Sequence, residues 1–257
     1  MRFLEPLLAK MYISLITTAA GYEVYGELRK NSRLLKRFER QQCRNLTELS
    51  EQVTKLSRES ALSYVVLLES EAKQGVLQSC GTNSEVELSS VERVCAEKRW
   101  GIYIDKDDLF EVQKRYKSVG LDLLFSPYSL LADCFEQEIK NQDGLYLLIY
   151  EAFLLGMVIK DAKALYGKIA ALDETLILAD SSSTVGIYME EVQSMIKDFY
   201  DAKIDETMFI EQLFIADAEH FDTKLENQLE ETLFVEVQKR NIDLGAQLVT
   251  LAEKELL

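Results

Sequence analysis

The chain has 257 residues, of which 47% are hydrophobic and 28% are charged, and this balance supports a globular core while excluding a disordered chain or a polytopic membrane protein. Two prolines and eleven glycines are few for the turns of a sandwich or a barrel, and good helix formers dominate the remainder. The formal net charge of -15 disfavours nucleic acid as a partner, because an acidic body repels phosphate.

This composition predicts an all-α fold, a bundle or orthogonal array of about eight helices with little or no β-structure. We expect one helical domain over residues 1–257. It is open to subdivision into an N-terminal helical pair at 1–79, central helices at 90–179 and acidic C-terminal helices at 185–257. The boundaries follow two polar breaks in which serine accumulates.

The first helix is expected to begin near Pro6, a residue suited to a first helical turn. Leu4, Met11, Thr18 and Tyr25 then recur every seven residues, as the apolar stripe of a packed helix does. The stripe favours a helix that docks on the protein core over one that spans a bilayer.

A basic segment follows this stripe. Residues 1–44 carry nine Lys and Arg against four Asp and Glu, hence +5, whereas residues 45–257 carry twenty against forty, hence -20. Such a segment can meet the chain's own acidic surface, a protein partner or an anionic membrane. The residues that we expect to bind a partner are Arg29, Lys30, Arg33, Lys36, Arg37 and Arg40.

A second long helix is expected from Asn45 to about Ser79, since Asn45 and Glu48 have the spacing of a capping box. A surface loop follows, and then a short helix after Ser90. The segment Trp100–Asp105 is the one candidate strand. Because it has no evident pairing partner, we interpret it as a buried connector.

Asp105 is expected to cap a helix that Gly120 ends, and Pro127 stands in the first turn of the next helix. The most hydrophobic segment, residues 145–159, is interpreted as the central core helix. It has fifteen residues and includes Glu151, whereas crossing a bilayer takes about twenty apolar residues.

Acidic helices are expected to complete the fold. One is predicted at 186–203, a long one from about 206 to 239, and a last one at 243–257. These helices offer acidic faces to a basic partner.

Four cysteines, Cys43, Cys80, Cys95 and Cys134, form no CxxC pair and, with one histidine in the chain, no zinc pattern. We interpret them as reduced thiols of a cytoplasmic protein. A Cys80–Cys95 disulfide across the polar loop between them stays open as an alternative.

Asp107, Asp108 and Glu111 place three carboxylates on adjoining helical turns. The cluster resembles the magnesium-binding motif of all-α prenyl-transferring and terpene-cyclising enzymes, but the second acidic motif of those families is missing. An acidic first turn favoured by the helix dipole explains the same residues.

Glu211, Asp217 and His220 could share one face of the long acidic helix and hold a metal ion. A di-iron site in a helical bundle needs two Glu-x-x-His motifs, however, and one histidine cannot supply two. A solvated histidine on an acidic face explains the pattern as well, so we assign no metal.

Glycine-rich phosphate loops, nucleophile elbows and zinc-protease motifs are missing from the sequence, so we predict no catalytic residue and no cofactor. The expected function is that of a non-enzymatic helical interaction protein, an adaptor or subunit of a larger assembly with protein partners or a second copy of itself. Two alternatives stay open. One is a membrane-associated component tethered through residues 1–44, and the other is a metal-dependent all-α enzyme that uses an acidic cluster.

Overall fold

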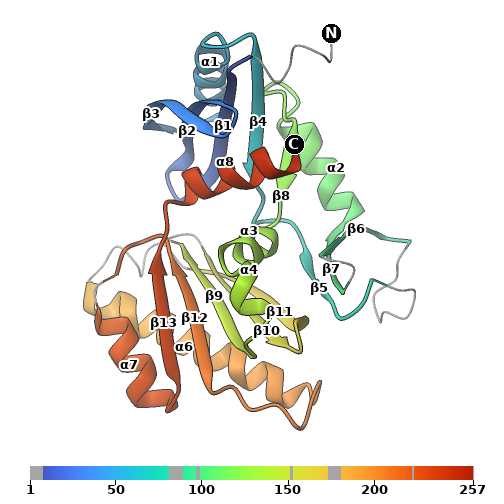
Figure 1. Cartoon of the computed structure of the whole chain (residues 1–257), viewed down its shortest axis with the longest axis vertical. Coiled ribbons are helices and arrows are strands. Elements are labelled where there is room, and N and C mark those ends of the chain that lie inside the picture. Colours follow the sequence, from blue (N-terminus) through green and yellow to red (C-terminus); the bar gives the residue numbers. More distant parts are fainter. Residues whose placement is uncertain are drawn as a thin grey trace. The chain divides into compact units, whose positions relative to one another are not determined.

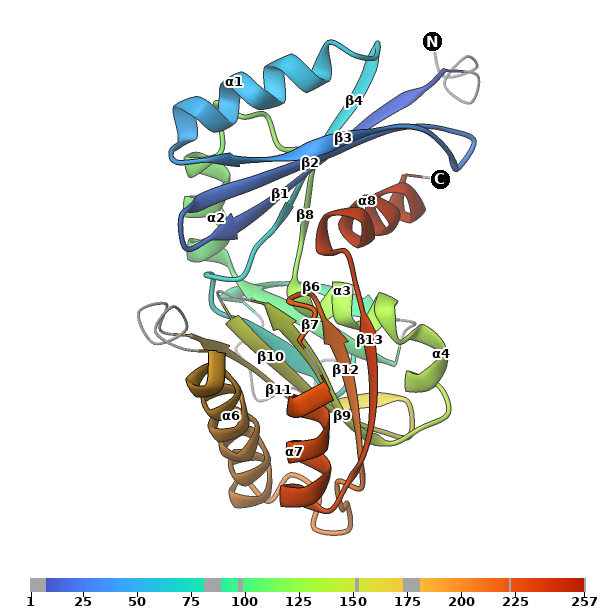
Figure 2. The ribbon, with the colours of Figure 1, turned by 90° about the vertical axis from the view of Figure 1, so that its left-hand side faces the viewer.

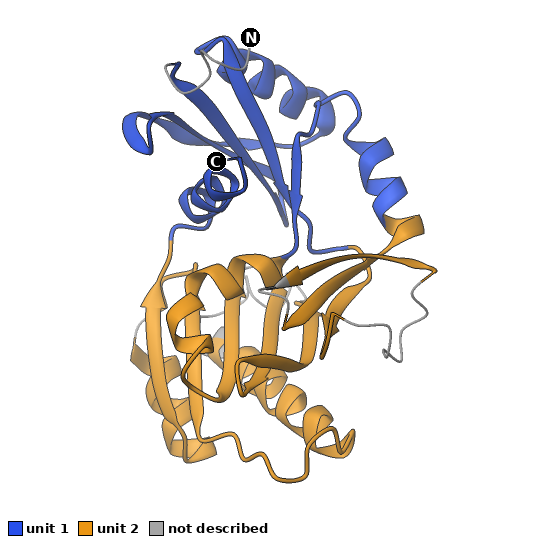
Figure 3. Ribbon diagram, turned by 45° about the vertical axis from the view of Figure 1, so that its right-hand side comes forward, with its two compact units in different colours: residues 1–71, 109–126, 243–257 blue, residues 72–108, 127–242 orange. Residues whose placement is uncertain are grey.

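The computed structural model describes residues 8–80, 89–96, 99–150, 153–172, 181–221 and 223–256. These residues form a mixed α/β protein with strands in three sheets, so the predicted all-α bundle is wrong. The chain divides into two compact units, coloured in Figure 3. Unit 1 comprises residues 1–71, 109–126 and 243–257, and unit 2 comprises residues 72–108 and 127–242. Each unit is assembled from separated stretches, unlike the continuous subdivision expected from the sequence.

Unit 1 contains a five-stranded sheet in the order β3-β2-β1-β4-β8 (Figure 1). β1 (Lys10–Thr18), β2 (Gly21–Lys30) and β3 (Arg33–Cys43) form an antiparallel meander. β4 (Leu62–Leu68) runs parallel to β1, and β8 (Leu123–Phe125) runs parallel to β4. The described part of the predicted first helix, and the basic segment after it, are therefore strands. Pro6 lies outside the described residues.

The misassigned first segment shows why a buried strand resembles a helix in sequence. Every residue from Met11 to Ile16 is buried, and a strand covered on both faces gives a continuous apolar run without alternation. The backbone turns are clearer signals. Gly21 has φ of 129°, and a side chain there would collide with the carbonyl oxygen of Cys43. Asn31 and Ser32 have φ of 50° and 60°, as in a type I′ hairpin turn.

Two helices cover opposite faces of this sheet, α1 (Leu46–Ser57) and α8 (Leu244–Glu255) (Figure 2). The predicted cap of α1 is confirmed, because the Asn45 side chain accepts hydrogen bonds from the backbone N–H groups of Thr47 and Glu48, both at 3.0 Å. The helix ends at Ser57, however, and not near residue 79.

Unit 2 contains a second five-stranded sheet in the order β11-β10-β9-β12-β13. Its strands are β9 (Gly144–Tyr150), β10 (Phe153–Lys160), β11 (Lys163–Ala171), β12 (Gln212–Asp217) and β13 (Glu236–Asn241). The predicted core helix at 145–159 is thus the hairpin of β9 and β10. All seven residues of β9 are buried, so its apolar run carries no period that separates strand from helix.

Helices cover both faces of the sheet of unit 2 (Figure 2). α6 (Ser181–Asp201) and α7 (Thr223–Leu233) pack against one face, and α3 (Pro127–Cys134) packs against the other, next to α4 (Glu136–Ile139). The helices predicted near 127–139, 186–203 and 243–257 are confirmed. The predicted long helix at 206–239 is wrong, since β12, α7 and β13 occupy it.

A smaller sheet of unit 2 has the order β5-β7-β6. Its central strand β7 (Trp100–Asp105) is the segment interpreted as a connector, and it pairs antiparallel with β5 (Gln74–Leu77) and β6 (Val91–Ala96). β6 replaces the short helix predicted after Ser90. A disulfide joins Cys80 to Cys95, whose Cα atoms lie 5.7 Å apart, so these two thiols are not reduced as predicted.

The two large sheets repeat one topology. In each, a three-stranded antiparallel meander comes first, and two further strands are then added beside its first strand and parallel to it, each after a helical connection. The connections carry α1 and α2 (Lys106–Arg115) in one sheet and α6 and α7 in the other. No sequence repeat marks this duplication, because the same strand order is reached with different residues.

Candidate functional site

Parallel strands end side by side in each unit. In unit 1 these are β1, β4 and β8, and in unit 2 they are β9, β12 and β13. Open α/β sheets bind ligands outside the carboxyl ends of their parallel strands, because loops and helix starts can converge there. Each of these edges is therefore a candidate functional site within its own unit.

The carboxyl edge of unit 1 carries a buried carboxylate, Glu69, which directly follows β4. Glu69 is only 2% exposed, and its Oε1 accepts a hydrogen bond of 2.6 Å from the backbone N–H of Glu71. The Glu71 carboxylate in turn accepts a 2.6 Å hydrogen bond from Arg115 Nη1. This hydrogen bond is the largest cause that raises the pKa of Arg115 above its usual value. Two carboxylates and one guanidinium thus surround the end of β4.

Hydroxyl groups lie beside this carboxylate. The parallel register of β1 and β4 ends with Ile16 opposite Leu68, so Thr17 and Glu69 directly follow the same pair, and Thr18 ends β1 at the hairpin to β2. The Thr18 hydroxyl is buried and has no hydrogen-bond partner among the described residues. Tyr116 is also buried, and this burial raises the pKa of its phenol to about 12. The edge therefore offers both acidic and neutral hydrogen-bonding groups.

The carboxyl edge of unit 2 carries a matching carboxylate, Asp217, the last residue of β12. It is fully buried, and its Oδ1 accepts a 2.9 Å hydrogen bond from the backbone N–H of Glu219. Lys239 of β13 lies close, with its Nζ 3.6 Å from Asp217 Oδ2 and 3.1 Å from Glu226 Oε2. Lys239 also donates to the carbonyl oxygen of Phe221 at 2.7 Å. The charge of Asp217 is therefore balanced within unit 2.

Glu69 and Asp217 occupy corresponding places in the two sheets. Each stands at the carboxyl end of the strand that is parallel and adjacent to the first strand of its meander. Each accepts the backbone N–H of the residue two positions further along the chain. The duplicated topology therefore brings one buried carboxylate to the same position in each unit.

The first predicted metal cluster lies on α2. The Asp105 side chain accepts from the Asp107 backbone N–H at 2.9 Å, which confirms Asp105 as the helix cap. The Asp108 side chain accepts from the Lys73 backbone N–H at 2.7 Å, and Glu111 pairs with Lys114 at 3.2 Å. Within the predicted cluster, the carboxylates of Asp108 and Glu111 are thus engaged separately, and Asp107 contributes its backbone N–H to the cap of α2.

The second predicted metal cluster is divided by the strand that replaces its helix. Glu211 precedes β12, Asp217 ends it, and His220 follows in an exposed turn with φ of 56°. A strand rises about 3.3 Å per residue, so Glu211 and Asp217 lie on the order of 20 Å apart. Nowhere in the described ranges do three Asp, Glu, His or Cys side chains converge as a metal site would require.

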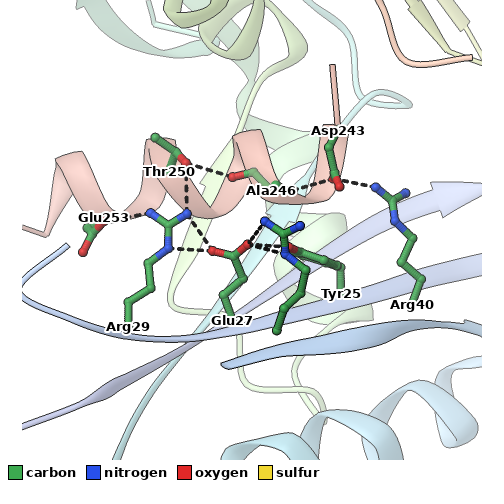
Figure 4. Close-up of polar contacts among 9 residues, drawn as sticks. Tyr25, Glu27, Arg29, Arg40, Asp243, Ala246, Thr250 and Glu253 are labelled. Carbon is green, nitrogen blue, oxygen red and sulfur yellow. Dashed lines mark hydrogen bonds and ion pairs between the residues drawn. The ribbon is translucent and has the colours of Figure 1, made fainter. Parts of the chain in front are cut away.

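The basic residues predicted to bind a partner lie on β2 and β3, and several belong to a charged network with α8 (Figure 4). At its centre is Glu27, which is 0% exposed. Arg29 Nε donates to Glu27 Oε2 at 2.6 Å, and its Nη1 donates to Glu253 Oε2 of α8 at 2.8 Å. Arg37 Nε donates to Glu27 Oε1 at 3.3 Å, and the Tyr25 hydroxyl donates to the same carboxylate.

Two further basic residues also pair within unit 1. Arg40 contacts Glu23 at 2.7 Å and also Asp243, the N-cap of α8, and Lys36 contacts Glu59 at 3.1 Å. The remaining two of the six, Lys30 and Arg33, are exposed at the turn between β2 and β3. The basic segment thus meets the chain's own carboxylates, and its binding of a partner stays a prediction.

Sequence reasoning missed Glu69 and Glu27. Glu69 follows the apolar run Tyr64–Leu68, and a carboxylate directly after a buried strand is a usable signal once that run is assigned to a strand. Assigned to a helix, the same residue looks like an ordinary surface glutamate. Asp217 was predicted as a candidate metal ligand, together with Glu211 and His220 on one helix, but it lies at the end of the strand β12.

Comparisons with known proteins place the fold. A family described as a domain of unknown function (DUF8569) matches residues 8–132, and a second such family (DUF8341) matches residues 180–257. No curated protein matches the chain by sequence. The structure is similar to a Bacteroides thetaiotaomicron protein with an actin-like ATPase fold and unknown function. The TM-score is 0.55 at 10% identity, over 93% of this chain and 95% of the other. A chain of the PilM-PilN type IV pilus biogenesis complex gives a TM-score of 0.55 at 11% identity, over 90% and 88% of the two chains.

These similarities correct the predicted function. The prediction of a helical adaptor or assembly subunit depended on an all-α architecture, and the actin-like α/β fold contradicts it. The two alternatives, a tether through an N-terminal helix and a metal-dependent all-α enzyme, depended on the same architecture and are contradicted with it. None of the described helices is both long and apolar enough to cross a bilayer. The cytoplasmic location stays a prediction.

Proposed function

We propose that the chain binds a nucleotide at the carboxyl ends of its parallel strands. The observation that supports this most directly is the repeated buried carboxylate, Glu69 in one sheet and Asp217 in the other, in a fold similar to that of a chain with an actin-like ATPase fold. A buried carboxylate costs free energy to desolvate, so its repetition at one position of a duplicated fold favours a role in binding.

The chemistry of the edges suits a nucleotide. A carboxylate there can accept hydrogen bonds from ribose hydroxyls, or hold the water shell of a divalent cation carried by the phosphates. The Arg115 guanidinium and the Thr17 hydroxyl can donate to phosphate oxygens. Each edge has one basic residue beside carboxylates, Lys239 with Asp217 and Glu226 in unit 2 and Arg115 with Glu71 in unit 1. Unit 1 is the first place to test, because its edge also has the hydroxyl of Thr18, which is buried without a hydrogen-bond partner among the described residues.

The experiment is calorimetric titration of the full chain with ATP, with and without Mg²⁺, for the wild type, Glu69→Gln and Glu211→Gln. Glu211 is the matched control, because it is a glutamate at the opposite end of a parallel strand. We expect the wild type and Glu211→Gln to bind alike. Glu69→Gln should bind at least tenfold more weakly, which corresponds to about 1.4 kcal/mol.

A folded Glu69→Gln variant with unchanged ATP affinity would contradict the assignment of the edge. If that variant does not fold, Thr17→Val perturbs the same edge and takes its place. Failure of ATP, ADP and GTP to bind at millimolar concentration would contradict the proposed function itself. Release of phosphate, measured in parallel, decides whether ATP is also hydrolysed.

A further inference from the structure

Two of the most exposed aromatic side chains of the described chain lie at one edge of unit 2. Phe234 is 92% exposed and Phe209 is 74% exposed. They belong to the segments that precede β13 and β12, and these strands begin side by side, with the Glu236 backbone N–H donating to the Glu211 carbonyl oxygen at 2.9 Å. Both phenylalanines therefore lie at the amino-terminal edge of the sheet, opposite to the carboxyl ends described above.

Phe234 is unfavourable for stability in two respects. It follows the last residue of α7 with φ of 57°, a left-handed conformation that suits glycine and is rare for a bulky residue. Its backbone N–H caps the helix by donating to the Glu230 carbonyl oxygen at 3.0 Å, a bond that glycine would make equally well. Its ring meanwhile gains almost nothing from burial. A strained and exposed aromatic ring points to a role in binding a partner.

Exposed carboxylates lie close to the two phenylalanines along the chain. Glutamates stand two or three residues from each phenylalanine along the chain, and all four are exposed. These are Glu206, Glu211, Glu231 and Glu236. We name this set, with Phe209 and Phe234, the acidic phenylalanine surface.

A cavity adjoins this surface at Phe209. It has a volume of about 680 Å³ and is lined by Met208, Phe209 and Glu211, and by Asp161 in the turn between β10 and β11. Two lysines also line it, and both are paired, Lys160 with Asp205 at 2.6 Å and Lys140 with Glu136 at 2.8 Å. The hydrogen bond from Lys160 is the largest cause that lowers the pKa of Asp205 to about 2. The carboxylates of Glu211 and Asp161, in contrast, form no ion pair within the described ranges of the chain. The cavity can therefore take a long cationic side chain.

We propose that the acidic phenylalanine surface binds a basic peptide segment of a protein partner, with an apolar side chain on the two rings and a lysine or arginine at the cavity. Charge complementarity selects this occupant, because opposite potentials steer association and like charges suppress wrong partners. Exposed aromatic rings supply the buried anchor that such interfaces need. Nucleic acid and anionic membranes are disfavoured by the same carboxylates.

The test uses a phage-displayed library of random twelve-residue peptides, panned on the full wild-type chain after depletion on Phe234→Gly. The highest-ranked peptide is then synthesised with a fluorescent label and titrated by anisotropy. We expect enriched peptides to combine Lys or Arg with a large apolar residue. The affinity should fall at least tenfold in Phe234→Gly and in Phe209→Ala, and about threefold to tenfold in Glu211→Gln/Glu231→Gln.

Phe110→Ala is the matched control, because Phe110 is 62% exposed on α2, outside the surface, and its loss should change the affinity less than twofold. Phe234→Gly should remain folded, since its backbone conformation suits glycine, and an unchanged or raised melting temperature verifies this. ATP binding should be unchanged in Phe234→Gly. Peptide binding therefore tests the acidic phenylalanine surface, and ATP binding tests the proposed nucleotide site independently.

Three results would overturn the proposal. Panning could enrich nothing above a control without protein, the enriched peptides could be acidic, or they could bind Phe234→Gly as they bind the wild type. A wild-type chain that self-associates in sedimentation while Phe234→Gly stays monomeric would also overturn it, because the occupant would then be a second copy of the chain.

Discussion

Replacing Glu27 tests whether the basic segment of β2 and β3 has a structural role. Glu27 is 0% exposed, and three groups donate to its carboxylate, from Tyr25, Arg29 and Arg37. Glu27→Gln keeps the shape but removes the charge. Arg29, whose side chain is 14% exposed, then keeps Glu253 as its one ionic partner among the described residues.

The expected cost follows from burial. Breaking a buried ion pair by removing one partner costs about 3 to 5 kcal/mol, because the remaining charge stays desolvated. We therefore expect Glu27→Gln to lower the free energy of unfolding by about 3 kcal/mol. Glu59→Gln is the matched control, since the pair of Glu59 and Lys36 is exposed, at 41% and 52%, and such pairs contribute about 0 to 1 kcal/mol.

The assay is urea unfolding followed by far-ultraviolet circular dichroism. Fluorescence alone is unsuitable, because the single tryptophan, Trp100, lies in unit 2 and not in the unit that contains Glu27. The reasoning is refuted if Glu27→Gln and Glu59→Gln destabilise the chain equally, or if Glu27→Gln costs less than about 1 kcal/mol.

Three smaller predictions concern single features. Asn45→Ala removes the side-chain cap of α1, so the free energy of unfolding should fall by about 1 kcal/mol in the same urea assay, and no change would contradict the cap. The Cys80–Cys95 bond closes a separation of 15 residues, so Cys80→Ser should cost about 3 kcal/mol, and alkylation of the unfolded, unreduced chain should label two of the four cysteines; four labelled thiols would exclude the bond. Burial raises the pKa of Tyr116 from 10.0 to about 12, so the folded state binds more protons than the unfolded state over that range, and stability should fall as pH rises from 10 to 12. Tyr116→Phe should make this fall shallower in urea midpoints measured from pH 9 to 12, and an unchanged slope would contradict the shift.

The helix starts that were predicted correctly have local signals. Asn45 and Glu48 cap α1, Asp105 caps α2, and Pro127 begins α3, and each of these signals acts within one turn of its own helix. Such signals can be read from a single sequence because they need no knowledge of what packs against the helix.

β1 and β9 were mispredicted because they are buried on both faces. The runs Met11–Ile16 and Leu145–Tyr150 are buried throughout, so alternation between polar and apolar residues is lost, and a seven-residue recurrence arose by coincidence. The β-branched residues Ile13, Ile16 and Thr17 and the glycine at position 21 were the available evidence for strands. Abundant Leu, Glu and Lys outweighed them.

The candidate site was missed for the same reason, because its residues are recognisable only when the strands before them are assigned correctly. Once Leu62–Leu68 is a strand, Glu69 becomes a carboxylate at its carboxyl end, and once Gln212–Asp217 is a strand, Asp217 becomes its counterpart. Their equivalence could not be predicted, because it depends on two sheets that share a strand order without sharing residues. Phe234 carries a signal that sequence alone does not show, its left-handed backbone.

The central claim is tested most directly by hydrogen–deuterium exchange of the full chain with and without Mg²⁺ and ATP. A nucleotide bound at the carboxyl edge of unit 1 should slow exchange at backbone amides of the hairpin Thr17–Tyr22 and of the segment from Glu69 to Glu71. It should leave the strand β3 and the segment around Phe209 unchanged. If ATP slows exchange at neither Thr17–Tyr22 nor Glu69–Glu71, or only at the amino-terminal edge of unit 2, the account of the site is wrong.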